Sequence, residues 1–509
     1  MATLGIVLLP GQNFLLLSAI VVIAAFVWHY LRRPRNLPPG PRGLPLVGSA
    51  LSLGERPDLT LKDWAKTYGP VMSVYLGPQL TVVLSNAASA KDAFLKQGDA
   101  FSGRPEFPMF DAIINEIITD SNITSGNHGL VFSTGKLWKE QRKFALAKLR
   151  GFGVGKVSLE SKIKEEISIL LVAIKSTNGE AFDIQPLLNT SVCNVICSIM
   201  WGNRFEHHDE QFKILMKALN QEFVNFATTG LLNFLPWLRH VPPYRKLMQD
   251  ILCNERKIFE VLKKNRDAHV SNFDEDNIRD FTDAYQHEIQ LEQKKSHETT
   301  FTDMELLFVI WDLFMAGTET TSTTMRWAML FMLKHPKICR KVQVEIDDVI
   351  GGGRLPAMAD ANMMPFTEAT IMEIQRLGNI APLAVPHATS EQVEFRGYTI
   401  PANTTVMSNI TAIMMDPTYF PNPERFCPER FLDENGRVIK NEAFIPFSVG
   451  RRVCLGESLA KMELFLFFTS ILQNFDVKLP DGVMEPSFEG IFGATWMPKP
   501  HKICICARE

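Results

Sequence analysis

The feature that most limits the possible folds is a long segment with almost no polar face, "DMELLFVIWDLFMAGTETTSTTMRWAMLFMLKH" (Asp303 to His335). A helix that is apolar on all sides has to be surrounded by other elements, so this segment predicts the central helix of a large core. Two more segments, Ser158 to Ser176 and Glu457 to Phe475, have apolar spacings of three and four and predict further long helices. We therefore expect a mainly α-helical domain.

Short segments rich in β-branched residues occur between the helical ones. Val71 to Gly77 and Leu80 to Ser85 are separated by a Pro-Gln pair, which predicts a hairpin. Val393 to Pro401 predicts a second pair of strands. The expected fold class is mainly α with small β-sheets.

The N-terminus has the composition of a membrane anchor. Residues 1–30 contain no Asp, Glu, Lys or Arg, and Phe14 to Trp28 is apolar enough for the centre of a spanning helix of about 20 residues. Arginines follow this segment and none precedes it, which favours an uncleaved anchor with the rest of the chain in the cytosol. We predict an anchor over residues 1–31, a proline-rich hinge over 32–48 and one catalytic domain over 49–509.

Composition excludes several classes of protein. A net charge of −3 gives no general basis for binding nucleic acid. The eight cysteines are scattered and form neither a disulfide framework nor paired zinc motifs, so reduced thiols are expected. Cys193 and Cys197 lie four apart on a predicted helix without a second ligand pair, and ordinary packing is the expectation.

One cysteine has a distinctive setting, in "FSVGRRVCLG" (Phe447 to Gly456). Cys454 could be a structural thiol, a redox thiol or a metal ligand. It stands in a loop just before a helix, where helix amides and the charges of Arg451 and Arg452 are expected to favour its thiolate. The arrangement suits a thiolate ligand.

The spacing of Phe447, Gly450, Arg452, Cys454 and Gly456 resembles the haem-binding signature of the cytochrome P450 family. The resemblance implies the cytochrome P450 fold with one N-terminal transmembrane helix. It also implies haem b as the cofactor, with Cys454 as the axial iron ligand and Arg452 close to the haem.

Other motifs extend the resemblance along the chain. "EIQR" and "FCPERF" are similar to family motifs that form a network of Glu373, Arg376 and Arg430. Taken alone, Glu373 and Arg376 would be a surface pair. "WKEQR" resembles the helix that places Trp138 and Arg142 against haem propionates, and "VPHAT" has His387 at a further propionate contact. Without the resemblance these three would be a core tryptophan, a solvated arginine and a loop histidine.

The stretch "AGTETTSTT" (Ala316 to Thr324) places seven polar residues inside the apolar central helix. Such residues are costly to bury without partners, although threonines can bond back to the preceding helical turn. The stretch resembles the family's oxygen-activation motif. The resemblance implies that Ala316 and Gly317 make room above the haem and that Glu319 and Thr320 deliver protons to bound dioxygen.

The resemblance therefore implies a monooxygenase that uses O2 and electrons from NADPH. The expected donor is the flavoprotein NADPH–cytochrome P450 reductase, with cytochrome b5 as a second donor, on the cytosolic side of the endoplasmic reticulum membrane. The basic segment Gly135 to Arg150 is either the docking face for the donor or a solvated helix face. Two alternatives stay open: an isomerase or dehydratase of the same fold that needs no external electrons, and a non-catalytic haem-binding protein.

Within the family, the chain is similar to microsomal family-two members, including the vertebrate polyunsaturated-fatty-acid epoxygenases. We therefore expect hydroxylation or epoxidation of lipophilic small molecules such as fatty acids, steroids or xenobiotics. The apolar segment Phe223 to Leu238 suits a substrate that enters from a bilayer, and it would equally suit core packing.

Overall fold

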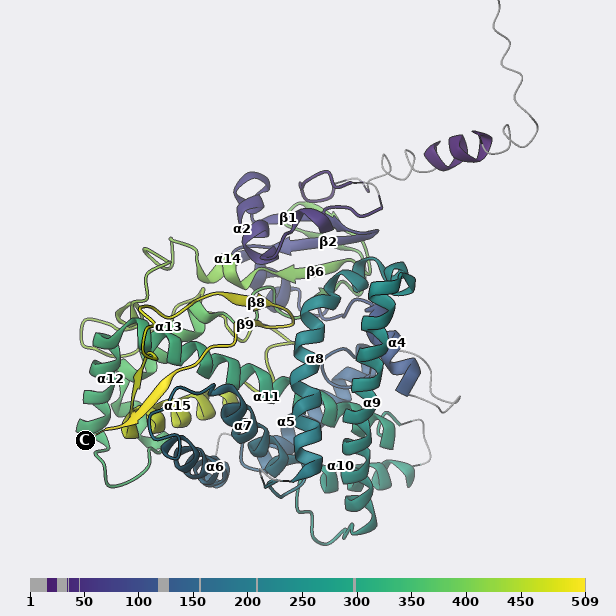
Figure 1. Ribbon diagram of the computed structural model, residues 1–509. Helices are drawn as coiled ribbons and strands as arrows, with labels where there is room; N and C mark the ends of the chain where they lie inside the picture. Colours follow the sequence, from purple (N-terminus) through teal and green to yellow (C-terminus); the bar gives the residue numbers. More distant parts are fainter. Residues whose placement is uncertain are drawn as a thin grey trace, which may run out of the picture.

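Helix α11 (Asp303–Lys334) crosses the middle of the molecule in the computed structural model (Figure 1). The structure describes residues 16–24, 34, 36–44, 46–117, 128–154, 157–206, 209–295 and 299–508, without the side chains of 157, 158, 223, 224, 226–229 and 231. The Thr302 side chain caps α11 by accepting a hydrogen bond from the Glu305 amide at 3.1 Å. Most of its side chains are buried, as predicted for a central helix.

The other long helices surround α11 and bury its apolar sides. Those that pack directly on it are α7 (Gln185–Met200), α9 (Pro242–Ser271), α10 (Phe281–Gln293), α12 (Pro336–Val349), α13 (Pro365–Gly378) and α15 (Glu457–Asn474). Further out lie α2 (Pro57–Tyr68), α4 (Pro108–Ile117), α5 (Gly135–Gly151), α6 (Val157–Lys175) and α8 (Glu210–Phe234). The short helices are η1 (Ala50–Ser52), α3 (Ala87–Lys91), η2 (Asp92–Lys96), η3 (Pro236–His240), η4 (Met358–Met363), α14 (Ile410–Met414) and η5 (Pro428–Phe431). The prediction of a mainly helical domain is confirmed.

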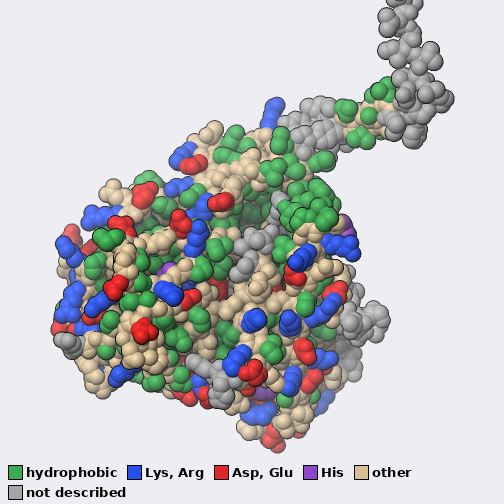
Figure 2. All heavy atoms as spheres, viewed as in Figure 1, with side chains coloured by type: hydrophobic (Ala, Val, Ile, Leu, Met, Phe, Trp, Pro, Cys, Tyr) green, Lys and Arg blue, Asp and Glu red, His purple; other side chains and the backbone are tan. Residues whose placement is uncertain are grey.

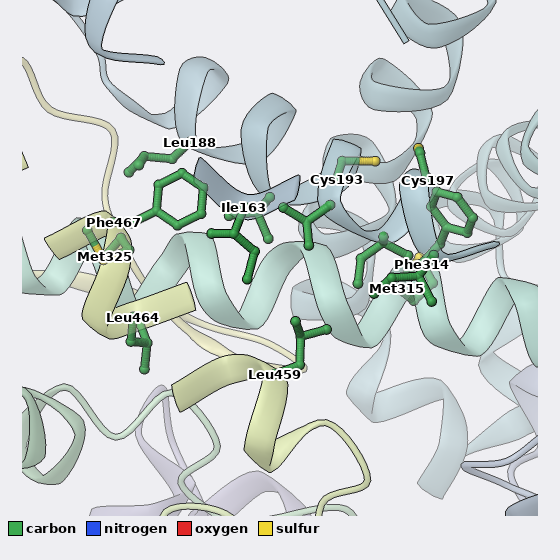
Figure 3. Close-up of a cluster of buried hydrophobic side chains, with 14 of the residues drawn as sticks. Ile163, Leu188, Cys193, Cys197, Phe314, Met315, Met325, Leu459, Leu464 and Phe467 are labelled. Atoms are coloured by element: carbon green, nitrogen blue, oxygen red, sulfur yellow. The ribbon is translucent and has the colours of Figure 1, made fainter. Parts of the chain in front are cut away.

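The main core lies where α6, α7, α11 and α15 meet. Figure 3 shows side chains from these four helices in one cluster, among them Ile163, Phe314 and Phe467. Cys193 and Cys197 are part of this core and have no exposure to solvent. Their prediction as packing residues is confirmed.

In the described part of the chain, the strands form one four-stranded sheet and three two-stranded ones. The larger sheet has the order β1-β2-β6-β3, with only the β2–β6 pair parallel. Its strands are β1 (Val71–Leu76), β2 (Gln79–Leu84), β6 (Thr405–Ser408) and β3 (His387–Ala388). The small sheets pair β4 (Val393–Phe395) with β5 (Tyr398–Ile400), β7 (Phe475–Lys478) with β10 (Cys504–Ala507), and β8 (Gly490–Phe492) with β9 (Trp496–Pro498). Both predicted strand pairs, β1–β2 and β4–β5, are present.

The predicted anchor lies largely outside the described residues. Residues 16–24 are helical. In Figure 1 they lie away from the domain, on the side where β1 and β2 are found. Within the described ranges, no helix is both long enough and apolar enough to cross a membrane. A spanning helix over residues 1–31 therefore stays a prediction.

The described part of the proline-rich segment is fastened to β1. Ser73 donates from its hydroxyl to the Pro38 carbonyl at 2.6 Å and from its amide to the Pro39 carbonyl at 2.9 Å. A Cβ atom on Gly40 would lie 1.7 Å from the Ser73 carbonyl oxygen, so only glycine permits this approach. The segment thus leads directly into the sheet.

Candidate active site

The loop that carries Cys454 is a tight turn in front of α15. The Cys454 amide donates to the Phe447 carbonyl at 3.1 Å and closes the turn. Gly450 has a φ of 90°, and a Cβ atom there would lie 2.1 Å from the Phe94 carbonyl oxygen, so glycine is required. The turn directs the Cys454 side chain into a cavity, where it is accessible to a ligand although protein surrounds it.

The electrostatic setting of Cys454 differs from the one predicted. Burial raises the pKa of the Cys454 thiol, while the backbone amides of Gly456 and Glu457 and the Arg142 guanidinium act in the opposite direction. Taken together, the protein groups around Cys454 do not favour its thiolate form. A bound metal ion deprotonates a coordinating thiol, and the amides and Arg142 favour that state.

The two arginines next to the cysteine have other partners. Arg451 forms an exposed ion pair with Asp99 at 2.6 Å. Arg452 turns inward, and its Nε donates to the Ser102 carbonyl at 2.9 Å. The prediction that Arg451 and Arg452 favour the thiolate is wrong, because the guanidinium that acts on the sulfur comes from α5.

The cavity has a volume of about 320 Å³ and lies between α11, α13, α15 and the cysteine loop. Six of the residues predicted for the site line it: Arg142, Ala316, Thr320, His387, Arg452 and Cys454. Much of the remaining lining is aliphatic, including Leu130, Val131, Leu313, Ile380 and Val385. The structure thus joins six of the eight predicted residues, and Trp138 and Glu319 are not in contact with the cavity.

Three arginines converge on one side of the cavity. Burial lowers the pKa of Arg452 to about 8, with the charges of Arg104 and Arg142 adding to the effect. Burial likewise lowers the pKa of Arg104 to about 9, again with a contribution from Arg142. Burial, followed by the charge of Arg104, lowers the pKa of His387 to about 3. Cations that repel one another in a buried site favour an anionic ligand.

Arg104 is a site residue that the sequence did not single out. Its Nε donates to the Val131 carbonyl at 2.8 Å, and its Nη1 donates to the Pro386 carbonyl at 2.7 Å. These bonds hold the guanidinium at the cavity wall beside the segment that ends at His387. Its only sequence signal is its place in "FSGRP", which carries no chemistry by itself.

Trp138 lies behind the arginines. The guanidinium of Arg452 stacks 3.8 Å from the centroid of its ring. Trp138 is buried, and its Nε1 has no hydrogen-bond partner within the described part of the chain. A buried indole N–H without an acceptor is costly, so this group also suits an anionic ligand.

The central part of α11 presents one stripe to the cavity. Ala316 and Thr320 line it, and the Thr320 hydroxyl donates back to the Ala316 carbonyl at 2.6 Å. The backbone bond considered from the sequence is therefore present at Thr320. A Cβ atom on Gly317 would lie 2.6 Å from the Ile196 side chain, so this glycine also lets α7 approach closely.

Glu319 faces another direction. Its carboxylate accepts a hydrogen bond from the Thr323 hydroxyl at 2.6 Å, one turn further along the helix. Burial raises the pKa of Glu319 to about 7, against the effects of Thr323 and Arg326. The structure does not bring Glu319 and Thr320 into contact, so their joint role stays a prediction.

Two other buried acids, Asp312 and Glu463, do line the cavity and were not predicted. Glu463 of α15 accepts a hydrogen bond from the Thr321 hydroxyl at 3.2 Å. Burial raises the pKa of Glu463 to about 8. Glu463 is a single glutamate inside the apolar run Met462 to Phe468, and this gave no pattern that sequence reasoning could use.

The predicted network of Glu373, Arg376 and Arg430 is present. Glu373 accepts from Arg376 Nε at 2.7 Å, from Arg376 Nη2 at 2.8 Å and from Arg430 Nε at 3.0 Å. The side chains of Glu373 and Arg376 have no exposure to solvent. The network joins α13, which lines the cavity, to the loop that contains η5.

One group of possible metal ligands lies elsewhere among the described residues: His269, Asp280 and Asp283. Asp283 pairs with Arg279 at 2.6 Å, and Asp280 caps α10 while it contacts His269 at 2.9 Å. These carboxylates are already neutralised or hydrogen-bonded, so the cluster is structural.

The fold and the site define a haem-thiolate protein, and comparison with known proteins agrees. Residues 38–505 match the family described as Cytochrome P450. Cytochrome P450 2U1 of Rattus norvegicus is 38% identical over 518 residues, covering 97% of this chain and 95% of that protein. Cytochrome P450 2C3 of Oryctolagus cuniculus is 41% identical over 467 residues, covering 91% and 92%. Cytochrome P450 18a1 of Drosophila melanogaster is 38% identical over 505 residues, covering 97% and 91%.

The chain belongs to the cytochrome P450 family. It is a haem monooxygenase whose cofactor is haem b. The site fits that cofactor, because the arginine cluster and the free N–H of Trp138 suit propionate carboxylates and Cys454 lies across the same cavity. A redox partner and a small-molecule substrate follow from membership of the family.

Proposed function

We propose that the protein hydroxylates or epoxidises lipophilic small molecules, with electrons that pass from NADPH through NADPH–cytochrome P450 reductase. Cytochrome b5 is proposed as a second donor. The observation that carries this function is the position of Cys454 and Thr320 on one cavity that is largely aliphatic and has cations on one side. An aliphatic wall selects substrates by shape and hydrophobicity rather than by charge.

Haem would be held at both its iron and its propionates. Cys454 would bind the iron, and Arg104, Arg142, Arg452 and Trp138 would bind the propionates, with His387 beside them. When bound, haem supplies the reductive activation of dioxygen, and a thiolate ligand favours cleavage of the O–O bond.

The α11 stripe would orient substrate and protons within the cavity. Ala316 has a small side chain that is exposed to the cavity, which leaves room for a substrate carbon. The Thr320 hydroxyl has its proton directed to the Ala316 carbonyl, so its oxygen is free to accept a hydrogen bond from the cavity side. Thr320 would thereby orient a proton donor in the cavity, and it would deliver its own proton only after its hydroxyl rotates away from the Ala316 carbonyl.

A membrane location is proposed from apolar groups near the N-terminal segment. Leu44, Leu46 and Trp237 have exposed fractions of 61%, 79% and 60%. Gly77, in the β1–β2 turn, lies against the Phe234 carbonyl at the end of α8, so the sheet and the start of η3 adjoin. Figure 2 shows hydrophobic atoms gathered on this side of the molecule, where the N-terminal chain leaves it. This surface and the apolar residues 1–30 would hold the domain on the cytosolic face of the endoplasmic reticulum membrane.

The apolar segment 223–238 is proposed as the entry side for substrate. Most of its side chains up to residue 231 lie outside the described set, so this prediction depends on sequence. The described end of the segment includes the exposed Trp237. An exposed tryptophan suits the interface between water and lipid.

The electron donor would dock on α5. Lys136, Lys139 and Lys143 are exposed on one face of this helix. Arg142 of the same helix donates to the Val453 carbonyl, next to Cys454. A basic surface beside the cysteine loop suits an acidic flavoprotein surface.

The test is the carbon monoxide spectrum of the reduced protein. Thiolate-ligated haem gives a Soret band near roughly 450 nm, and Cys454→Ala should abolish it. Cys253→Ala is the matched control, because Cys253 is an exposed thiol of α9 outside the cavity, and it should keep the band. Turnover of a lipid and drug panel with reductase and NADPH then identifies the substrate. An unchanged band in Cys454→Ala would refute the assignment.

A further inference from the structure

A pair of buried carboxyl groups lies between α8 and α9, away from the haem cavity. Glu222 of α8 and Glu255 of α9 are both 0% exposed. Asn254 Nδ2 donates to Glu222 Oε2 at 3.0 Å, and Trp311 Nε1 donates to Glu255 Oε2 at 3.1 Å. In both carboxyl groups the remaining oxygen, Oε1, is buried and has no donor among the described groups.

The pair has no counter-ion in the described part of the chain. Burial raises the pKa of Glu255 well above its ordinary value, and the charge of Glu222 adds to the shift. Burial also raises the pKa of Glu222, against hydrogen bonds from Asn254, Glu255 and Asn225. No lysine, arginine or histidine contributes to either shift.

Several charged groups on the elements packed around the pair have partners of their own. Arg256 of α9 is ion-paired with Glu116 of α4. Asp312 of α11 accepts from the Leu130 and Val131 amides. Two further groups on α11 and α4 are Glu305, which contacts His128, and Asp111, which is near Glu106. None of them contributes to the shifts of the pair, so Glu222 and Glu255 titrate against each other.

We propose that Glu222 and Glu255 share one proton and that this proton fastens α8 and α9 to the cavity-lining part of α11. A single proton between the two orphan Oε1 atoms supplies the donor that both lack, and it removes the cost of two adjacent carboxylates in a buried site. The carboxyl pair links α8 to α9, and the Trp311 bond links α9 to α11. Figure 1 shows α8 and α9 side by side in front of α11.

The connection to the cavity is short. Trp311 immediately precedes Asp312, which lines the cavity. The Asp312 carboxylate holds the backbone at Leu130 and Val131, two further lining residues. Glu222 and Glu255 are therefore positioning residues for the substrate side of the cavity, and their effect passes through Trp311.

The proposal fixes the sign of a pH effect. Unfolded glutamates lose their protons near the ordinary value of 4.5, whereas the folded pair keeps one proton to a pH well above it. The folded state then binds one proton more than the unfolded state, so stability falls as pH rises through this window. One proton corresponds to about a tenfold increase in the unfolding equilibrium constant per pH unit.

The experiment is urea-induced unfolding of the full-length holoprotein at a series of pH values from about 5 to 8, a range in which the unfolded glutamates are ionised. Glu255→Gln keeps an acceptor for Trp311 and supplies a permanent donor to Glu222. The unfolding equilibrium constant of the variant should rise less steeply with pH than that of wild type. The ratio of the wild-type constant to the variant constant should grow by about tenfold per pH unit. Glu260→Gln, an exposed change on the same helix, should keep the wild-type slope.

A second measurement does not depend on stability. The double variant Glu222→Gln/Glu255→Gln should remove one protonated-carboxyl band from the infrared spectrum at neutral pH. An intact carbon monoxide band in these variants separates the outcome from any failure of the haem site. A wild-type pH slope in Glu255→Gln, or an infrared band unchanged in the double variant, would overturn the shared proton.

Discussion

Replacing Glu373 by Gln should be among the most destabilising single changes outside the cavity. Glu373 accepts four hydrogen bonds, because the Cys427 amide adds a fourth at 2.9 Å to those from Arg376 and Arg430. A glutamine has one acceptor oxygen and no charge, so Arg376, which is 0% exposed, would be left as a buried cation without a counter-ion. Removing one partner of a buried ion pair costs about 3–5 kcal/mol. The free energy of unfolding of a whole domain is only about 5–15 kcal/mol, so this one change would remove a large share of it.

The assay is urea unfolding together with the haem content of the purified protein. Asp63→Asn is the control, since the Asp63–Lys66 pair has the same i,i+3 spacing but is 66% and 71% exposed. Such a surface pair contributes about 0.5 kcal/mol or less. The double variant Glu373→Gln/Arg376→Met should recover part of the loss, because the fully buried cation is gone and only Arg430 still lacks its carboxylate. A cost for Glu373→Gln no larger than that of the control, or no recovery in the double variant, would refute this reasoning.

Three further predictions concern the site. Thr320→Ala should keep haem content and substrate binding but yield more peroxide and less product per NADPH, whereas loss of folded haem protein would indicate that Thr320 is structural. Glu463→Gln should become more stable relative to wild type as pH rises from 4.5 to about 8. Burial raises the pKa of Glu463 to about 8, so in this range the folded wild type keeps a proton that the unfolded chain has lost, and its free energy of unfolding falls as pH rises. Equal pH slopes for variant and wild type in unfolding experiments would contradict this. Lys139→Glu with Lys143→Glu should slow reduction by the flavoprotein and flatten its salt dependence while a peroxide-driven reaction is spared, and equal loss of both reactions would exclude a docking role.

The long elements could be predicted because their signals are local. The central helix was expected over Asp303 to His335 and is observed as Asp303–Lys334, since Thr302 caps one end and Pro336 begins the next helix. The β1–β2 hairpin was predicted from alternating β-branched residues and pairs with Val71 opposite Leu84. Both depend on neighbours in sequence, which a pattern can record.

The site residues that were missed depend on contacts between distant segments. Arg104 is held by carbonyls 27 and 282 positions away, and Glu463 meets Thr321 across 142 positions. Before the fold is known, each is a single charged residue without a periodic partner. The same limit explains the misassigned role of Arg451, since its partner Asp99 is 352 positions away.

The separation of Glu319 from Thr320 has a simpler cause in helix geometry. Successive residues of an α-helix point about 100° apart, whereas residues four apart share a face. Ala316, Thr320 and Thr324 therefore form one stripe that lines the cavity, and Glu319 with Thr323 forms another that is buried behind it. Adjacency in the motif identifies the residue types that the chemistry needs but does not place the two side chains together. The acids that do share the cavity lining with Thr320 are Asp312, about two turns earlier on α11, and Glu463, contributed by a different helix.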